Sequence, residues 1–397
     1  MQNVPHDTCL GGYRTSARIA GLACLVPALS VMAQQPDRVL VEEWRLGGPD
    51  GRGAAAFTSE PAVVVERRGK LYTRGSRDSH ISVFDSTGTF LRTIGRRGQG
   101  PGEFFVVSGH GFVGDTLWAA DARSRAISTF DANGRHLETR RVIVELAERF
   151  AGAVGVSALL SNGRAIVIPS DAPMDADGRL TVPVLIGDRQ MHSRDTLLSM
   201  VRPEYLFVPR VGTFWWIPVV IPPRIDVAPD GTGILVVNWE RNGEEVEVRR
   251  LNPDGRARWR RTLTLPSPMI DSRARDSIVD RAMQMAAVQV EASKRRGEVA
   301  RGVSTRSLVE SGLDLPDRYP PVTHAVLGVD GAVWLQRGGP GPARRWSVLD
   351  SAGTRLFDVT SSLPLTVQEA TRDVVWATFS DEDGFPYLIR YRVWARD

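Results

Sequence analysis

The chain contains an internal repeat with a period of 46 residues. Two copies match at Leu71-Tyr72, Ile81, Phe84-Asp85 and Gly88 in the first, and at Leu117-Trp118, Ile127, Phe130-Asp131 and Gly134 in the second. One such unit is too short to bury its own apolar residues, so neighbouring copies must pack together. The period accommodates four short strands with their turns, which is the content of one β-propeller blade.

A hairpin recurs within the repeats. Residues 81–84 read as a half-buried strand, 85–88 (Asp-Ser-Thr-Gly) as a tight turn, and 89–94 as the returning strand. Later copies of the hairpin lie at 246–255 and 346–353, and a degenerate copy covers 161–167 and 181–186. The chain therefore reads as a series of hairpin-built sheets.

The two ends of the chain complement each other. The last copy supplies only three strands, at 367–370, 374–379 and 387–393, while the strand-like run 39–44 has no partner nearby in sequence. Pairing that run with the last blade closes the ring and removes exposed sheet edges. The sequence thus predicts an all-β fold, a six-bladed β-propeller of four-stranded antiparallel blades. The blades are expected to start near residues 62, 106, 154, 224, 322 and 365.

Two insertions account for most of the remaining length, at 201–223 and 267–321. The second is predicted to be mainly helical, over 266–321 between blades 4 and 5, with Asp271 or Ser272 as its cap and Gly297 near its end. Its apolar residues recur at helical spacing: Ile278, Val279, Ala282, Met283, Ala286 and Val290. We expect this apolar face to dock onto the propeller.

The first 33 residues resemble an export signal. Arg14 and Arg18 precede a short apolar run at 19–31, which ends in Val-Met-Ala at 31–33. A membrane helix needs about 20 apolar residues, so no transmembrane segment is expected. We predict a signal peptide at 1–33 and a single propeller domain at 34–397, periplasmic or extracellular. The alternative is a lipoprotein anchored through Cys24.

Composition excludes several kinds of chemistry. Cys9 and Cys24 are the two cysteines, so a chain cleaved after Ala33 has no disulfide, no cysteine nucleophile and no cysteine-bound zinc. The net charge of +4, from 50 basic and 46 acidic residues, is too small for a typical nucleic-acid binder. We therefore expect no nucleic-acid partner.

Residues 94–104, with the sequence I-G-R-R-G-Q-G-P-G-E-F, form a glycine-rich loop. Glu103 is placed to accept hydrogen bonds from its amides, and no Lys-Ser or Lys-Thr pair follows as in a phosphate-binding loop. The segment resembles the blade-linking loop of six-bladed, NHL-repeat-like propellers of bacterial exported proteins and lipoproteins. The likeness extends through 117–121 and 127–134 and recurs weakly at 319–322 and 383–393. It implies the fold, and a function that ranges from binding modules to a minority of lyases and lactone or ester hydrolases.

No catalytic constellation is visible. The five histidines after residue 33 are His80, His110, His136, His192 and His324, and none forms a metal-spaced pair. The acidic runs 175–178 and 381–384 lack the later glutamate of a calcium loop, and no G-x-S-x-G elbow is present. We expect no catalytic residue, no metal ligand and no cofactor, with calcium as an open alternative.

The best candidate for binding is the mouth of the channel. Loops that join second to third strands, and loops that join successive blades, open on the same face. Their cationic residues are Arg77, His80, Arg96, Arg97, Arg123, Arg125, Arg337, Arg344 and Arg345. Arginine binds carboxylate, sulfate or phosphate through paired hydrogen bonds, although scattered surface arginines are equally expected in so arginine-rich a chain.

A second candidate is the pair Trp215 and Trp216 in the first insertion, which could form a sugar or peptide platform or an apolar cover. Together these features predict a monomeric exported binding or scaffold propeller. Its partner would be a protein, a peptide or an anionic glycan or other small anion. The competing hypothesis is a metal-dependent lyase or lactone/ester hydrolase.

Export makes a direct prediction. Protein isolated from the cell envelope or the medium should begin at Gln34, as measured by intact mass and N-terminal sequencing. A lipid-modified first residue at Cys24 would instead establish the lipoprotein alternative, and an intact Met1 start would contradict both.

Overall fold

The structure is a computed structural model. It describes residues 38–144, 154–169, 180–202, 205–208, 212–216, 221, 223–299, 302–313 and 315–395. The predicted signal segment 1–33 and the acidic run 175–178 lie outside the described residues. Within the described part of the chain, no helix is long and apolar enough to cross a membrane.

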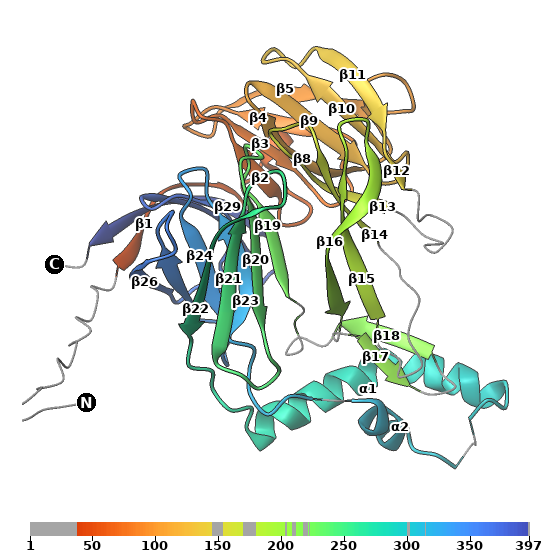
Figure 1. The fold of residues 1–397 in the computed structure, drawn as a ribbon. Helices are drawn as coiled ribbons and strands as arrows, with labels where there is room; N and C mark the ends of the chain where they lie inside the picture. Colours follow the sequence, from red (N-terminus) through yellow and green to blue (C-terminus); the bar gives the residue numbers. More distant parts are fainter. Residues whose placement is uncertain are drawn as a thin grey trace, which may run out of the picture. The chain divides into compact units, whose positions relative to one another are not determined.

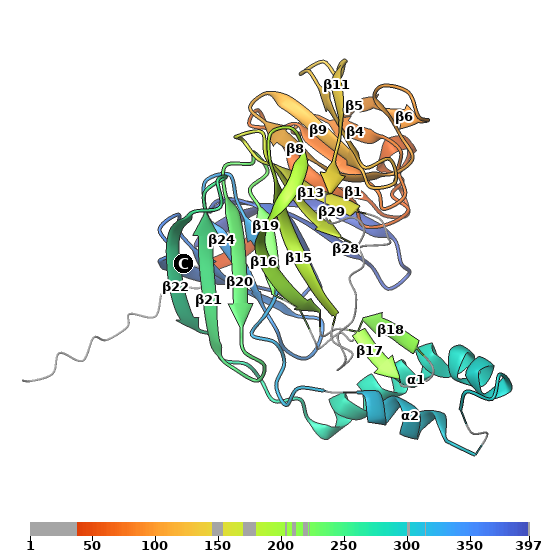
Figure 2. The same ribbon diagram turned by 45° about the vertical axis from the view of Figure 1, so that its right-hand side comes forward.

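Strand pairing groups the described strands into six blades (Figures 1 and 2). Blade 1 contains β2 (Ala62–Val65), β3 (Leu71–Arg74), β4 (Ile81–Phe84) and β5 (Phe90–Ile94), and blade 2 contains β8 (Val107–Val113), β9 (Thr116–Asp121), β10 (Ala126–Phe130) and β11 (His136–Arg141). Blade 3 contains β13 (Val154–Leu159), β14 (Ala165–Pro169), β15 (Leu180–Gly187) and β16 (His192–Arg202), and blade 4 contains β19 (Arg224–Val227), β20 (Ile234–Trp239), β21 (Glu245–Leu251) and β22 (Ala257–Thr264). Blade 5 contains β23 (Val322–Leu327), β24 (Val333–Arg337), β25 (Arg344–Leu349) and β26 (Arg355–Ser361), and blade 6 contains β27 (Thr366–Ala370), β28 (Val374–Ser380), β29 (Pro386–Ala395) and β1 (Arg38–Gly47).

The N-terminal strand completes the last blade, as predicted. β1 pairs antiparallel with β29, from Arg38 opposite Ala395 to Gly47 opposite Tyr387. Across this pairing Glu43 forms ion pairs with Arg390 and Arg392. β1 also pairs in parallel with β26 over two residues, so it joins blades 5 and 6 into one sheet. The two ends of the chain therefore share one blade.

The repeated residues are core residues. Leu71 and Leu117, Ile81 and Ile127, and Phe84 and Phe130 are each at most 2% exposed. Their side chains fill the spaces within and between adjacent sheets, where a change of volume is felt directly. The repeat is visible in the sequence because these sites have the same packing neighbours in both blades.

The first strand of each blade lies at the centre, and these inner strands contact one another from blade to blade. Four of them contain a β-bulge at a polar residue: Ser108, Ser157, Thr323 and Gln368. A bulge redirects the side chain of the extra residue and increases local twist. The inner strands thereby present polar groups near the axis, which the sequence pattern did not predict.

The two insertions form a separate layer (Figures 1 and 2). The first contains a hairpin of β17 (Tyr205–Val208) and β18 (Gly212–Trp216), which we had not predicted, and the second contains α1 (Ser272–Arg295) and α2 (Thr305–Gly312). The predicted helix and its cap are confirmed, since Asp271 accepts a hydrogen bond of 2.7 Å from the backbone N–H of Ala274.

The predicted docking of the helix onto the propeller is wrong. The apolar face of α1 packs against α2 and the following segment, in a cluster that includes Ala286, Val290, Val309, Leu315 and Tyr319. Leucine and tyrosine side chains from the return segment provide a nearer apolar surface than the blades do. The helical insertion thus has a small core of its own.

Both insertions connect an outer strand to the next inner strand. They leave the propeller from the side that carries the second-to-third strand loops, which we call the connection face. The opposite side, with the turns between first and second and between third and fourth strands, we call the hairpin face. At the connection face Arg318 forms an ion pair of 2.9 Å with Glu244, and Arg337 donates a hydrogen bond of 2.6 Å to the carbonyl of Pro266.

Three short elements complete the described structure: the strands β6 (Arg96–Arg97) and β7 (Glu103–Phe104), which pair in parallel, and the 3₁₀-helix η1 (Gly53–Ala55). A further two-residue strand, β12 (Ile143–Val144), adds to the outer edge of blade 3 beside β16.

The packing of blade 2 generates a stability prediction. The indole of Trp118 lies over Gly111, and a Cβ at residue 111 would lie 2.9–3.0 Å from three of its ring atoms. Because Trp118 is only 3% exposed and its ring would have to shift to make room for the added Cβ, Gly111→Ala should lower the free energy of unfolding by about 1–3 kcal/mol, despite the conformational gain of alanine over glycine. Urea unfolding measures this change.

Gly302→Ala is the matched control, because no atom lies within 4 Å of the added Cβ there. It should change stability by less than about 0.5 kcal/mol. Equal effects of the two substitutions would show that the indole does not press on the inner strand.

Candidate functional site

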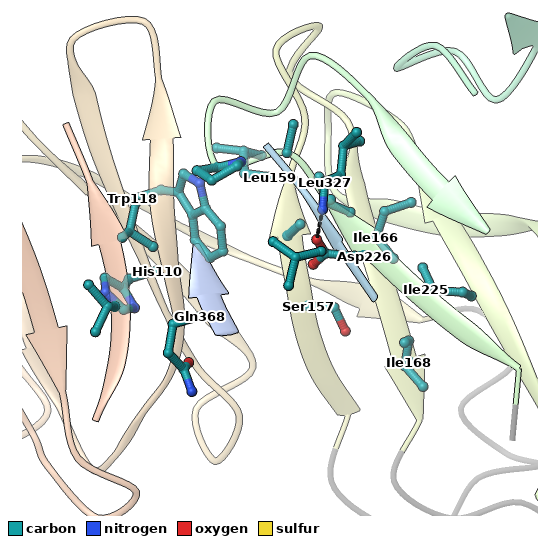
Figure 3. A pocket seen from close by; sticks show the side chains of 17 residues that line it. His110, Trp118, Ser157, Leu159, Ile166, Ile168, Ile225, Asp226, Leu327 and Gln368 are labelled. Carbon is teal, nitrogen blue, oxygen red and sulfur yellow. Dashed lines mark hydrogen bonds between the residues drawn. The ribbon is translucent and has the colours of Figure 1, made fainter. Parts of the chain in front are cut away.

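A cavity of about 270 Å³ lies on the axis of the propeller. Residues from all six inner strands line it, and they include Val63, His110, Ser157, Asp226, Leu327 and Gln368. In Figure 3, Trp118, His110 and Gln368 lie on one side of the cavity, and Asp226, Ser157 and Ile168 lie on the other. Most of the residues that line the cavity are apolar, but polar atoms contribute a large part of its wall.

Asp226 is the one carboxyl among the residues that line this cavity. Its Oδ2 accepts a hydrogen bond of 2.7 Å from the backbone N–H of Leu327 in the next blade (Figure 3). Burial raises the pKa of Asp226 to about 6, against the opposing effect of that hydrogen bond. No ion pair reaches Asp226 from the described arginines and lysines. Near neutral pH this carboxyl thus carries an uncompensated charge beside the cavity.

Glu369 repeats the arrangement between blades 6 and 1. Its Oε2 accepts a hydrogen bond of 2.5 Å from the backbone N–H of Val65, while its Oε1 is buried without a partner in the described part of the chain. Burial raises the pKa of Glu369 well above its ordinary value, and the charges of Asp226 and Asp230 raise it further. A second carboxyl therefore lies close to the axis.

Two histidines tie inner strands to neighbouring strands. Nε2 of His110 lies 2.9 Å from the carbonyl of Tyr72, and Nε2 of His324 lies 2.9 Å from the carbonyl of Val367. Burial lowers the pKa of His110 to about 3, with the nearby Arg74 contributing, and burial also lowers the pKa of His324. Both imidazoles are therefore neutral and donate to backbone carbonyls at ordinary pH.

Sequence reasoning missed these axial groups. Asp226 stands between Ile225 and Val227 in an inner strand, and Glu369 follows Gln368 in another. A charged residue at an apolar position of the repeat was the available signal, but it becomes visible only when the blades are aligned strand by strand. Among the described residues, no three His, Cys, Asp and Glu side chains are grouped closely enough to hold a metal ion.

The six predicted cationic residues of blades 1 and 2 lie in three loops of the connection face. Arg77 and His80 follow β3, Arg96 and Arg97 form β6, and Arg123 and Arg125 lie between β9 and β10. We call these six residues the arginine surface.

The three loops meet at the segment 104–107. Arg97 pairs with Phe104 in the β6–β7 ladder, and the guanidinium of Arg123 lies 4.5 Å from the centre of the Phe105 ring. The carbonyl of Asp78 accepts a hydrogen bond of 2.7 Å from the backbone N–H of Val107. One short segment therefore holds all three loops.

The carboxylates of this region hold turns. Glu103 accepts hydrogen bonds of 2.8 Å from the Gly100 N–H and from Arg96, which lower its pKa, as predicted for its role in the glycine-rich loop. Asp121 accepts from the backbone N–H groups of Phe105 and Arg123, and Asp78 from that of Gly75. Arg77 and Arg97 are exposed and form no ion pair with any described carboxylate.

The other predicted residues lie elsewhere. Arg337 contacts the second insertion as described above, Arg344 donates to the carbonyls of Gly341 and Pro342, and Arg345 forms an ion pair of 2.8 Å with the buried Asp358. These three belong to blade 5, separate from the arginine surface. Trp215 and Trp216 lie in β18, whose backbone lies beside α1.

Comparison with protein families supports the fold. A family model described as a 6-bladed β-propeller matches residues 58–152, which span blades 1 and 2. The resemblance to a six-bladed propeller family that residues 94–104 indicated is thereby confirmed. A comparison with curated proteins finds no match.

Among solved structures, the chain is similar to a member of the DUF4221 family from Bacteroides vulgatus, with 9% identity over 91% of this chain and 100% of that chain and a TM-score of 0.46. It is also similar to a protein described as exported from Bacteroides fragilis, with 10% identity over 91% and 95% and a TM-score of 0.42. A third is virginiamycin B lyase from Staphylococcus aureus, with 12% identity over 87% and 98% and a TM-score of 0.34. At these identities and scores the likenesses relate this chain to no ligand and no reaction.

The raised pKa of Asp226 predicts a pH-dependent stability. A carboxyl whose pKa rises from 3.8 to about 6 on folding stabilises the fold below its ordinary pKa, and that contribution is lost as the pH rises through about 6. Asp226→Asn imitates the protonated form and keeps an acceptor for the Leu327 N–H. The variant should equal the wild type near pH 4 and be more stable by up to about 3 kcal/mol at pH 8.

Urea unfolding of both proteins between about pH 4 and 8 measures this difference. Asp115→Asn, at an exposed turn of blade 2, is the control for the removal of a surface carboxylate and should change stability by less than about 0.5 kcal/mol. A difference that stays constant with pH for Asp226→Asn would mean that Asp226 titrates normally.

Proposed function

We propose that this protein is a non-enzymatic, exported binding propeller whose arginine surface binds an anionic ligand or partner. The observation that carries the proposal is the convergence of three arginine-bearing loops on the segment 104–107. A shared support of this kind holds several cationic side chains on one surface, whereas arginines scattered over the molecule would have no common support.

The charge of this region supports an anion as the ligand. Between residues 74 and 125 the connection face carries six arginines (Arg74, Arg77, Arg96, Arg97, Arg123 and Arg125) and three carboxylates (Asp78, Glu103 and Asp121). Each of the three carboxylates accepts a backbone hydrogen bond, and Glu103 also pairs with Arg96. The guanidinium groups of Arg77 and Arg97 are then available for an external acceptor.

The stacking of Arg123 on Phe105 favours a ligand with carboxylate, sulfate or phosphate groups. A guanidinium that stacks on an aromatic ring through its face keeps its N–H edge for paired hydrogen bonds to such groups. Anionic glycans and acidic peptides carry these groups repeatedly along a chain. Both are found in the periplasm and outside the cell, where the predicted signal peptide would deliver the protein.

The competing hypothesis is a metal-dependent lyase or lactone/ester hydrolase. No specific contact among the described residues favours it over binding. Metal analysis of the purified protein separates the two classes, since calcium or zinc at stoichiometric occupancy would replace the binding proposal with the enzymatic one.

The proposal predicts the effect of removing two exposed arginines. Binding to an immobilised sulfated glycan, with heparin as the probe, should weaken at least about tenfold in Arg77→Ala/Arg97→Ala, and the wild-type affinity should fall as salt is raised. Arg67→Ala/Arg68→Ala removes the same charge from the hairpin face, where both residues are exposed, and should change the affinity less than about threefold. Equal losses in both variants would show that net charge alone drives binding, and the arginine surface would then be rejected.

A further inference from the structure

We infer that the axial cavity is a binding site for a small organic cation, a primary alkylammonium group with a short apolar chain, which enters from the hairpin face and pairs with Asp226. This site is separate from the arginine surface, and its test does not depend on whether the arginine surface binds an anion. The inference rests on the lining of the cavity, on a carboxyl oxygen near it that lacks a partner among the described residues, and on the charge of the passage that leads to it.

The lining of the cavity combines one carboxyl with a group of isoleucine and valine side chains. Asp226 directs its carboxyl group toward the cavity (Figure 3), and Ile166, Ile168 and Ile225 line the same side. A charge in such surroundings is costly unless a counter-charge or several hydrogen bonds accompany it. The described chain supplies two backbone N–H groups, from Leu327 and Val227, and no cation. An ammonium group would supply both the missing charge and further hydrogen-bond donors.

A second carboxyl oxygen close to the axis also lacks a partner among the described residues. Glu369 is 5% exposed, and its Oε1 is buried without a partner in the same part of the structure. Ser157 lies at the bulge of its inner strand and lines the cavity. The oxygen atoms of Glu369 and Ser157 can accept hydrogen bonds from an ammonium group.

A second cavity of about 160 Å³ lies on the hairpin-face side of the first, and the two share Pro229. Its wall continues the inner strands, with Val65 following Val64 and Val329 following Leu327. On this inference, a ligand from the hairpin face crosses this second cavity, the passage, and moves past Pro229 to reach the axial cavity.

The mouth of this passage is acidic. Glu66, Asp115 and Asp230 line it together with one cation, Arg67. Carboxylates around a narrow opening attract cations and repel anions. The arginine surface on the connection face and this opening on the hairpin face thus carry opposite charge, and the opening on the hairpin face is the one that attracts a cation toward Asp226.

The size of the cavity sets the size of the ligand. A volume of about 270 Å³ is at the small end of ligand sites, which run from about 300 to 1,000 Å³. The isoleucine and valine walls suit a short alkyl chain, and the carboxyl of Asp226 suits the ammonium at its end. Cations with long or polar chains would leave unpaired groups against the apolar wall.

The experiment uses the purified protein with two probes of equal length, n-butylammonium and 1-butanol. We expect n-butylammonium to bind with a dissociation constant of about 1 mM or lower, measured by calorimetry and by tryptophan fluorescence, and 1-butanol to bind at least about tenfold more weakly. Asp226→Asn should remove this preference and leave the binding of 1-butanol unchanged. Glu382→Gln, at an exposed turn between β28 and β29 that lines neither cavity, is the control for general charge and should change the affinity less than about threefold.

Proton release gives an independent readout. An ammonium beside Asp226 favours its charged form, so binding near pH 6 should release protons, detected as a heat of binding that depends on the ionisation enthalpy of the buffer. The other titratable groups that face this site are Glu369 and Asp230, with His110 neutral across the cavity. Proton release should disappear in Asp226→Asn.

Ile168→Phe tests the location even if the asparagine variant folds poorly, because the larger ring fills the cavity and should abolish binding of both probes. Equal affinity of the wild type for the two probes, unchanged binding of n-butylammonium in Asp226→Asn or in Ile168→Phe, or no binding at about 10 mM probe would each overturn the inference.

Discussion

The closing of the ring is the constraint on which the rest of this structure depends. Six twisted sheets leave two open edges unless the first and last segments of the chain share a blade, and β1 meets this need by pairing with β29 along its whole length. Glu43 supports the pairing through Arg390 and Arg392. Once the ring is closed, the inner strands have fixed neighbours on both sides, and the axial cavity has a defined wall.

The inner strands are held to one another by unusual means. The strands around the axis do not form a continuous backbone ladder, so side chains supply some of the hydrogen bonds between neighbouring strands. Asp226 and Glu369 accept hydrogen bonds from backbone N–H groups of the next blade. His110 and His324 lie within hydrogen-bond distance of backbone carbonyls. Burial makes each of these groups costly in its charged form. The histidines avoid the cost by remaining neutral, whereas burial raises the pKa of both carboxyls, and these are therefore the groups on the axis whose ionisation a ligand can influence.

The two faces of the propeller differ in the length of their loops and in the charged groups at their openings. The connection face carries long insertions over blades 3 to 5 and the arginine surface over blades 1 and 2, while the hairpin face has short turns and an acidic opening to the axis. A propeller permits this division because its loops alternate between faces, so a loop on one face can change without disturbing the other. The second insertion likewise has a small core of its own, so it does not change the packing of the blades.

The sequence by itself determined the blade unit, the number of blades and the role of the N-terminal strand. These features depend on apolar periodicity and turn residues, which recur wherever the same local packing recurs, as at Leu71 and Leu117 or Phe84 and Phe130. Glu103 could likewise be placed from its own loop, because its partners are a few residues away.

The tertiary structure alone decided the axial site and the grouping of the arginines. Asp226 and Glu369 lie near the axis in blades far apart in sequence, close enough for the charge of Asp226 to affect Glu369. From the sequence, Arg345 and Arg97 had the same predicted role at the channel mouth, and only the structure shows that Arg345 pairs with Asp358. The β17–β18 hairpin and the packing of α1 on α2 were also not predicted from the sequence. The physical reason is the same in each case: a periodic pattern records which side of a strand or helix is buried, but it does not record which distant group lies opposite.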